Sequence, residues 1–316
     1  MKNSSPDKID KGKKRSRSAD LFRRLVKEKP LGLFGAIITL LLLFTAMFAN
    51  FLAPYGMNGV GAGPLLSPPS IHFWLGTDNL GRDLLSRIIY GARISVVVGL
   101  VGTMISVLIS TIIGVLSGYI GGAFDMSVQR IVDAWMCIPS LVMMMVLVSI
   151  IGPGVWQIII VMGISFGITG SRIVRSATMA IKENVYLQAA KGIGCSPYEI
   201  ITRHVLPNIL APIIVLFSTL VPVIILQEAS LSFLGFGVPP PAPSWGGLLT
   251  GSARSYMFQA PWLVLWPGLA LSIVVYGINM FGDALRDLLD PRLRGGVGRY
   301  GIKVKRTATT NPKGSI

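Results

Sequence analysis

Long stretches without a charged side chain are the feature that most constrains how this chain can fold. Leu31–Leu52 is one such stretch, and Ile94–Phe124 is another. A helix needs about 20 apolar residues to cross the hydrocarbon core of a bilayer, because it rises about 1.5 Å per residue. Both stretches are long enough, and we expect the second span to end near Gly118. Charged residues make up 14% of the chain, against about 25% in soluble domains, which indicates that lipid is the solvent.

Three further regions complete the count of spans. Ala134–Ser171 has no charge over 38 residues, which is too long for one helix, and Gly152-Pro153-Gly154 is the expected break between two short spans. Val205–Gln227 supplies a fifth span and Pro261–Gly282 a sixth. The sequence therefore predicts an all-α membrane protein with six transmembrane helices.

The distribution of lysine and arginine predicts how these spans are oriented. Of the 29 such residues, eleven precede Leu31, eight follow Gly282 and five lie from Arg172 to Arg203. With the N-terminus in the cytoplasm, all of these and Arg130 fall inside, and four arginines remain outside or at the interface. Both termini are therefore expected in the cytoplasm, with residues 57–74 and 238–256 on the outer side.

Small residues at a four-residue spacing indicate how two of the spans pack. Such residues let the backbones of neighbouring helices approach closely in lipid. They are Gly102, Ser106, Ser110, Gly114, Gly118 and Gly122 along the second span, and Gly163, Gly167 and Ser171 in the fourth. Four prolines also lie within spans, and we interpret them as tolerated kinks rather than hinges. They are Pro139, Pro212, Pro222 and Pro267.

Few side chains in the spans could take part in catalysis. Gly163–Gly167 reads G-I-S-F-G and fits the G-x-S-x-G pattern of serine hydrolases, but it lies inside a span, away from both histidines. Helix packing explains this match better, so a membrane enzyme such as an intramembrane protease stays a weak alternative. The cysteines, Cys137 and Cys195, form no metal-binding pattern. The sequence contains no phosphate-binding P-loop, and it predicts no metal, cofactor or catalytic residue.

The interiors of the six predicted spans contain no charged side chain. Ion-coupled secondary transporters usually place such groups near the middle of the membrane, so this alternative is weakened, although backbone carbonyls can bind Na⁺ without them. Glu228, at the outer end of the fifth span, is the nearest exception and could face either a translocation path or the water interface. Nucleic-acid binding is disfavoured because the basic residues flank membrane spans.

The most informative segment is the cytoplasmic connection between the fourth and fifth spans. Its residues favour a helix up to Lys191, and Gly192 and Gly194 favour a stop and a turn. Ser196-Pro197-Tyr198-Glu199 then forms a capping box with proline at the first helical position. The result is a helix, a glycine turn and a second helix. The segment is unusually apolar for a loop in water, so we expect a partner or a membrane surface to cover it. Its apolar residues are Val185, Tyr186, Leu187, Ile193 and Tyr198.

This segment resembles the "EAA" loop of ABC-importer permeases, whose pattern is E-A-A-x3-G-x9-I-x-L-P. The chain has Gln188 in place of glutamate and His204 in place of isoleucine. The resemblance implies that the loop docks on the ATP-binding subunit. It also implies that the coupling residues are Leu187, Gln188, Ala189, Ala190, Gly194, Ser196, Pro197, Leu206 and Pro207.

Other stretches resemble the "C"-type permease of the dipeptide/oligopeptide/nickel family. They are 75–87 (LGTDNLGRDLLSR), 228–237 (EASLSFLGFG), 239–246, and the C-terminal 282–292. From its residues alone, the first stretch indicates an interfacial helix capped by Thr77 or Asp78.

The resemblance implies the type I ABC importer fold and a non-catalytic permease in a bacterial or archaeal inner membrane. Its partners would be a paralogous permease, two ATPase subunits and an extracytoplasmic solute-binding protein, within membrane lipid and without nucleic acid. The solute would be a dipeptide, an oligopeptide, a glutathione-like peptide or a nickel chelate. The expected segments are a basic N-terminal segment (1–30), the first helix (31–53), an outer loop with the interfacial helix (54–92), a five-helix core (93–282) containing the coupling loop (172–207), and a basic tail (283–316).

Overall fold

The computed structural model describes residues 25–289, and nearly all regular structure in this part of the chain is helical. The long helices are α2 (Pro30–Met47), α4 (Leu84–Ile120), α5 (Gly122–Met136), α6 (Ser140–Ile151), α7 (Val155–Lys182), α10 (Leu206–Phe233) and α13 (Trp262–Leu289). The short helices are α3 (Ala49–Leu52), α8 (Val185–Gly192), α9 (Pro197–Glu199), the π-helix η1 (Ile200–Val205), α11 (Trp245–Leu248) and α12 (Ser252–Ser255). The predicted basic segments lie mostly outside the described residues.

Five helices are long and apolar enough to cross a membrane: α2, α4, α7, α13 and the continuous helix Pro197–Phe233. α5 and α6 form a sixth, broken span that bends by 89°. The six predicted spans are therefore present when the bent pair counts as one. The break expected at Gly152–Gly154 is confirmed, since α6 ends at Ile151 and α7 begins at Val155.

Three sequence predictions about helix ends are wrong. No separate interfacial helix precedes the second span in residues 25–289, because α4 runs unbroken from Leu84 to Ile120. Its cap is Asp83, whose carboxylate accepts a hydrogen bond from Ser86 N at 2.8 Å, and neither Thr77 nor Asp78 caps it. Pro139 is no tolerated kink, because it stands at the break between α5 and α6. A proline ring fits poorly inside a helix, so the chain turns there instead.

The predicted small-residue stripe joins α4 to α7. A Cβ atom added to Gly114 would lie 2.6 Å from the carbonyl oxygen of Ser171 and 2.8 Å from Arg175 N. Ser110 Oγ donates to the carbonyl oxygen of Gly167 at 2.9 Å across the same contact. The stripe ends before Gly122, whose added Cβ would meet nothing within 4 Å. The backbones of these two helices are therefore in close contact along the stripe.

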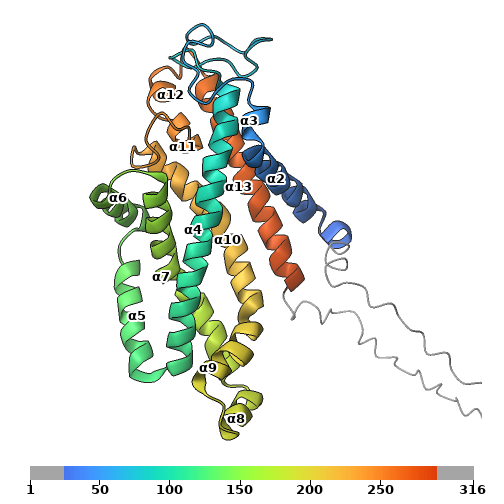
Figure 1. Ribbon diagram of the computed structural model, residues 1–316, viewed down its shortest axis with the longest axis vertical. Helices are drawn as coiled ribbons and strands as arrows, with labels where there is room; N and C mark the ends of the chain where they lie inside the picture. The colour runs from blue at the N-terminus through green and yellow to red at the C-terminus, as the bar shows by residue number, and fades with distance from the viewer. Residues whose placement is uncertain (1–24, 290–316) are drawn as a thin grey trace, which may run out of the picture.

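The helices divide the molecule into two ends, as Figure 1 shows. α8 and α9 project at one end, and α11, α12 and the connection between α3 and α4 lie together at the other. We refer to these as the α8 end and the α12 end. α2 packs along α13, where a Cβ added to Gly277 would lie 2.6 Å from Ile38 Cγ2. An ion pair of 2.5 Å between Lys29 and Asp287 also joins these two helices.

Candidate functional site

The segment from α8 to α9 has the helix–turn–helix geometry that the sequence predicts. α8 ends at Gly192, and Gly194 takes φ of +87°, a left-handed conformation that glycine adopts without steric cost. Ser196 then caps α9: its hydroxyl accepts from Glu199 N at 3.3 Å, and the Glu199 carboxylate accepts from Ser196 N at 3.1 Å. Pro197 occupies the first helical position. The capping box and the turn are both confirmed.

The exposed face of this segment is strongly apolar. Ile193 is 82% exposed, Val185 79% and Tyr198 76%, and Gln188 and Ala189 are exposed beside them. Isolated apolar side chains are common on protein surfaces, but a cluster of large ones at the tip of a projecting segment is typical of an interface. The projecting position is visible at the lower end of Figure 1.

Leu187 and Ala190 lie on the opposite face, which corrects the expectation that Leu187 belongs to the exposed apolar surface. Leu187 is 1% exposed and Ala190 6%. Both pack in a cluster with Val174 of α7 and Ile209 of α10. These residues therefore attach α8 to the membrane helices and are not available to a docking partner.

The other predicted coupling residues lie along one continuous path into the fifth span. Gly194, Ser196 and Pro197 are exposed in the turn, Leu206 is half-buried, and Pro207 is exposed in the first turn of α10. α9, the π-helix and α10 follow one another without a break. A displacement of the turn would therefore act directly on α10. No pattern in the sequence predicted the π-helix, which contains His204, one of the two departures from the EAA pattern.

A bidentate ion pair near the same end was missed by sequence reasoning. Arg175 of α7 donates to both carboxylate oxygens of Asp125 on α5, at 2.6 and 2.5 Å. Ser117 of α4 also donates to Asp125, and Arg172 pairs with Asp133. Bidentate pairs of this kind fix geometry as well as adding stability. They hold α5, the first half of the broken span, against α7.

Glu228 does not lie at a water interface, because it is fully buried inside α10, five residues before the helix ends. Its Oε1 accepts a hydrogen bond from Ser232 Oγ at 2.6 Å. The Ser244 hydroxyl also lies near Glu228, but Glu228 Oε2 has no hydrogen-bond partner among the described residues. A buried carboxylate with few donors is costly and is often functional.

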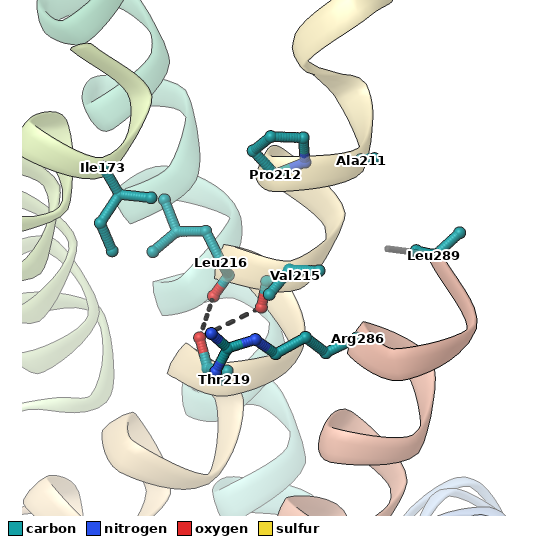
Figure 2. Close-up of a pocket in the computed structure, with 8 residues that line it drawn as sticks. All are labelled: Ile173, Ala211, Pro212, Val215, Leu216, Thr219, Arg286 and Leu289. Carbon is teal, nitrogen blue, oxygen red and sulfur yellow. Dashed lines mark hydrogen bonds between the residues drawn. The ribbon is translucent and has the colours of Figure 1, made fainter. Parts of the chain in front are cut away.

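An apolar cleft of about 470 Å³ opens between α7, α10 and α13. Figure 2 shows Arg286 of α13 extending toward Val215 and Thr219 of α10. The Thr219 hydroxyl is already used, since it contacts the carbonyl oxygens of Val215 and Leu216 at 3.1 and 3.0 Å. Thr219 and Arg286 are the polar members of an otherwise apolar lining. The cleft therefore offers apolar contact surface rather than a constellation for covalent chemistry.

The serine-hydrolase pattern has no catalytic context. Ser165 lies in the middle of α7 rather than at a strand–helix elbow, and Gly163 and Gly167 pack against Ile105 and Ile109 of α4. Within residues 25–289, no three His, Cys, Asp or Glu side chains are grouped as metal ligands. Cys137 and Cys195 are free.

Comparisons with known proteins agree with this geometry. The family model for the binding-protein-dependent transport system inner membrane component matches residues 110–295. The glutathione transport system permease protein GsiD of Escherichia coli is 37% identical over 275 residues, which cover 87% of this chain and 90% of that protein. The dipeptide transport system permease protein DppC of Alkalihalophilus pseudofirmus is 38% identical over 275 residues, with the same coverage. A putative peptide transport system permease protein of Brucella suis is 36% identical over 272 residues, 86% of this chain and 91% of that protein.

A solved structure shares the fold. It was determined for inward-facing conformations of the MetNI methionine ABC transporter, and the match has a TM-score of 0.54. It covers 65% of this chain and 96% of that chain at 18% identity. The helices therefore adopt the type I ABC importer fold, as the sequence resemblance implied. Since the family model spans more than half of the chain and the relatives nearly all of it, the protein belongs to the family of binding-protein-dependent transport system inner membrane components.

Proposed function

We propose that this protein is one of two permease subunits of an ATP-driven importer for short peptides. It would form half of the translocation pathway beside a paralogous permease. Two ATPase subunits would hydrolyse ATP, and an extracytoplasmic binding protein would deliver the solute. The names of the similar permeases, which refer to glutathione, dipeptides and peptides, favour a peptide over a nickel chelate.

The exposed apolar face of α8 and the following turn is the observation that supports this function most directly. Val185, Ile193 and Tyr198 project from the end of the bundle with nothing in residues 25–289 to cover them. Burying such side chains contributes roughly 25 cal/mol per Å² of apolar area, so a docked ATPase subunit would gain affinity from them. The unbroken path into α10 would then pass its movement to the membrane helices.

The orientation is part of the proposal. The α8 end would lie in the cytoplasm and the α12 end outside, because five basic residues lie between the second half of α7 and the start of α10: Arg172, Arg175, Lys182, Lys191 and Arg203. Single cysteines at Asn58 and Ser196, in a background without Cys137 and Cys195, would test this with a membrane-impermeant maleimide on intact cells. We expect labelling at position 58 alone. Labelling at position 196 alone would show that the orientation is the reverse of the one proposed.

The function itself is tested on the purified complex of both permeases and both ATPase subunits. Ile193→Asp places a charge in the proposed docked surface, where desolvation is costly. We expect loss of ATPase co-purification and of stimulation by the loaded binding protein. Ile71→Asp is the matched control, because Ile71 is 90% exposed at the opposite end and should leave co-purification unchanged. Full retention of the ATPase subunits by the Ile193→Asp variant would contradict the proposal.

An ion-coupled secondary transporter is the competing class. Transport that stops on ATP depletion and continues in the presence of an ionophore would favour the importer. The reverse pattern would favour ion coupling.

A further inference from the structure

Arg87, in the first turn of α4, is a buried cation with unused hydrogen-bond donors. Its side chain is 8% exposed, and its Nε and Nη1 atoms have no hydrogen-bond partner among residues 25–289. The nearest carboxylate oxygen, Asp78 Oδ2, lies 3.6 Å from Nη1. A buried guanidinium with unpaired N–H groups is costly, because it has lost water without gaining acceptors.

The two carboxylates beside Arg87 are already committed to other groups. Asp78 accepts hydrogen bonds from Arg82 Nε at 2.6 Å and from the backbone N–H groups of Leu80 and Arg82 at 2.8 and 3.0 Å. Asp83 caps α4 by accepting from the backbone and hydroxyl of Ser86 at 2.8 and 2.7 Å. Asp78 therefore balances the charge of Arg87 at 3.6 Å without accepting a hydrogen bond from it, and Nε and Nη1 still lack an acceptor among the described residues.

Arg87 lines a cavity of about 300 Å³ at the α12 end. Arg87 is the one charged side chain among the described residues that line it, and the other walls come from Pro153, Ser232 and the segment 235–250. Arg87 also borders a smaller cavity of about 160 Å³, which contains Asp78 and Arg82. Ligand pockets in proteins start at about 300 Å³, so the larger cavity has room for a small solute.

Another part of the cavity wall is polar and uncharged. Ser232 and Ser244 line it there, and the Ser232 hydroxyl donates to Glu228 Oε1 at 2.6 Å and accepts from Val238 N at 3.3 Å. Ser244 Oγ accepts from Gly247 N at 3.1 Å. One cavity is therefore lined by an arginine and by two serines.

We propose that this cavity binds the charged end groups of a short zwitterionic peptide. The peptide's carboxylate would pair with the guanidinium of Arg87, whose planar donors match a carboxylate in a bidentate manner. Its ammonium group would lie toward Ser232 and Ser244. The inference rests on the proposed function and adds a solute site in the permease itself, at the outer end of the pathway.

The proposed site should prefer a peptide with a free carboxylate over the same peptide with an amide in its place. A site built to hydrogen-bond one solute group discriminates strongly against an analogue that lacks it, because its own buried donors are then left unpaired. A peptide amide has the same shape as the free peptide but no carboxylate charge. Weaker binding of the amide is therefore the signature of Arg87.

The experiment measures equilibrium binding to the complex of both permeases and both ATPase subunits in nanodiscs, without binding protein. The probes are radiolabelled alanyl-alanine and alanyl-alanine amide. We expect the wild-type complex to bind the free peptide at least about tenfold more tightly than the amide. Arg87→Gln should weaken the free peptide by a similar factor and remove the difference. Arg87→Lys, which keeps the charge but not the planar fork, should keep part of it.

Arg254→Gln is the matched control, because Arg254 is an exposed arginine of α12 that lines neither cavity. It should preserve the ratio. Equal binding of the two probes by the wild type, or an unchanged ratio in Arg87→Gln, overturns the inference. If both Arg87 variants fail to assemble, the inference is judged on the wild-type complex alone, by the ratio of its affinities for the free peptide and the amide. Peptide import by the wild-type complex is measured in parallel, so that its absence contradicts the proposed function, whereas import with an unchanged ratio contradicts this inference alone.

Discussion

The two ends of the bundle differ in which side chains they bury and which they expose. At the α12 end, charged side chains are buried: Asp78, Arg82 and Arg87 are each no more than 14% exposed. At the α8 end, large apolar side chains are exposed, with Ile193 and Val185 near 80%. An isolated soluble domain would favour the reverse arrangement at both ends. Within residues 25–289, the α8 end therefore lacks a cover for its apolar side chains, and the α12 end lacks an acceptor for its buried arginine.

The difference indicates what each end has to receive. Exposed apolar surface is removed from water when another protein surface covers it, and the free energy of that burial does not depend on direction. A buried guanidinium with free donors is satisfied by a hydrogen-bonding anion in one geometry. The α8 end thus suits a large partner, and the α12 end suits a small charged solute. Substitutions at the two ends should accordingly have different consequences.

The largest effect is expected for Asp78→Asn at the α12 end. Removing this charge leaves Arg82 and Arg87 buried without their shared counter-ion, and breaking a buried pair typically costs about 3–5 kcal/mol. We expect a large fall in the thermal stability of the purified complex, together with poor yield. A fall of less than about 1 kcal/mol in the free energy of unfolding would mean that water reaches the cluster.

The next effect separates two residues of the α8 end that the sequence placed together. Leu187→Ala removes a buried side chain and should cost about 2–5 kcal/mol of stability. Ile193→Ala should leave stability within about 0.5 kcal/mol but reduce stimulation of the ATPase by the loaded binding protein. Thermal denaturation and ATPase rates on the same preparations distinguish the two roles. Equal loss of stability in both variants would contradict the assignment of faces.

A smaller effect is expected at the turn between α8 and α9. Gly194→Val forces a β-branched residue into a positive-φ conformation, which costs about 1–3 kcal/mol. Its added Cβ would meet nothing within 4 Å, so the cost is conformational rather than a clash. Gly194→Asn is the matched variant, because asparagine tolerates this region. We expect Val, but not Asn, to reduce cargo-stimulated ATP hydrolysis. Equal activity would show that the turn angle has no role in coupling.

The sequence predicted those features that follow from composition and local chemistry. Spans follow from apolar length, and the cap at Ser196 follows from the S-P-Y-E pattern, so both were recoverable. The stripe around Gly114 was recoverable because close packing in lipid requires small residues. The contrast between Leu187, buried in α8, and Ile193, exposed just after it, was not predicted, since it depends on how α7 and α10 lie beneath the loop. The Arg87 cavity was also missed, because its walls come from segments more than a hundred residues apart.

The smallest effect is expected for Asp287→Asn, which removes a charge at the opposite end from Asp78. Lys29 and Asp287 form an ion pair of 2.5 Å, but their side chains are 42% and 38% exposed. Water screens exposed charges, and holding two flexible side chains in one geometry costs entropy, so such pairs contribute about 0–1 kcal/mol. α2 and α13 remain joined by the contact between Gly277 and Ile38, which the substitution does not touch. We therefore expect a small change in thermal stability that shrinks further as salt is raised. A loss comparable to that of Asp78→Asn would show that this pair is shielded from water in the assembled complex, and the contrast between the two ends would then concern apolar surface alone.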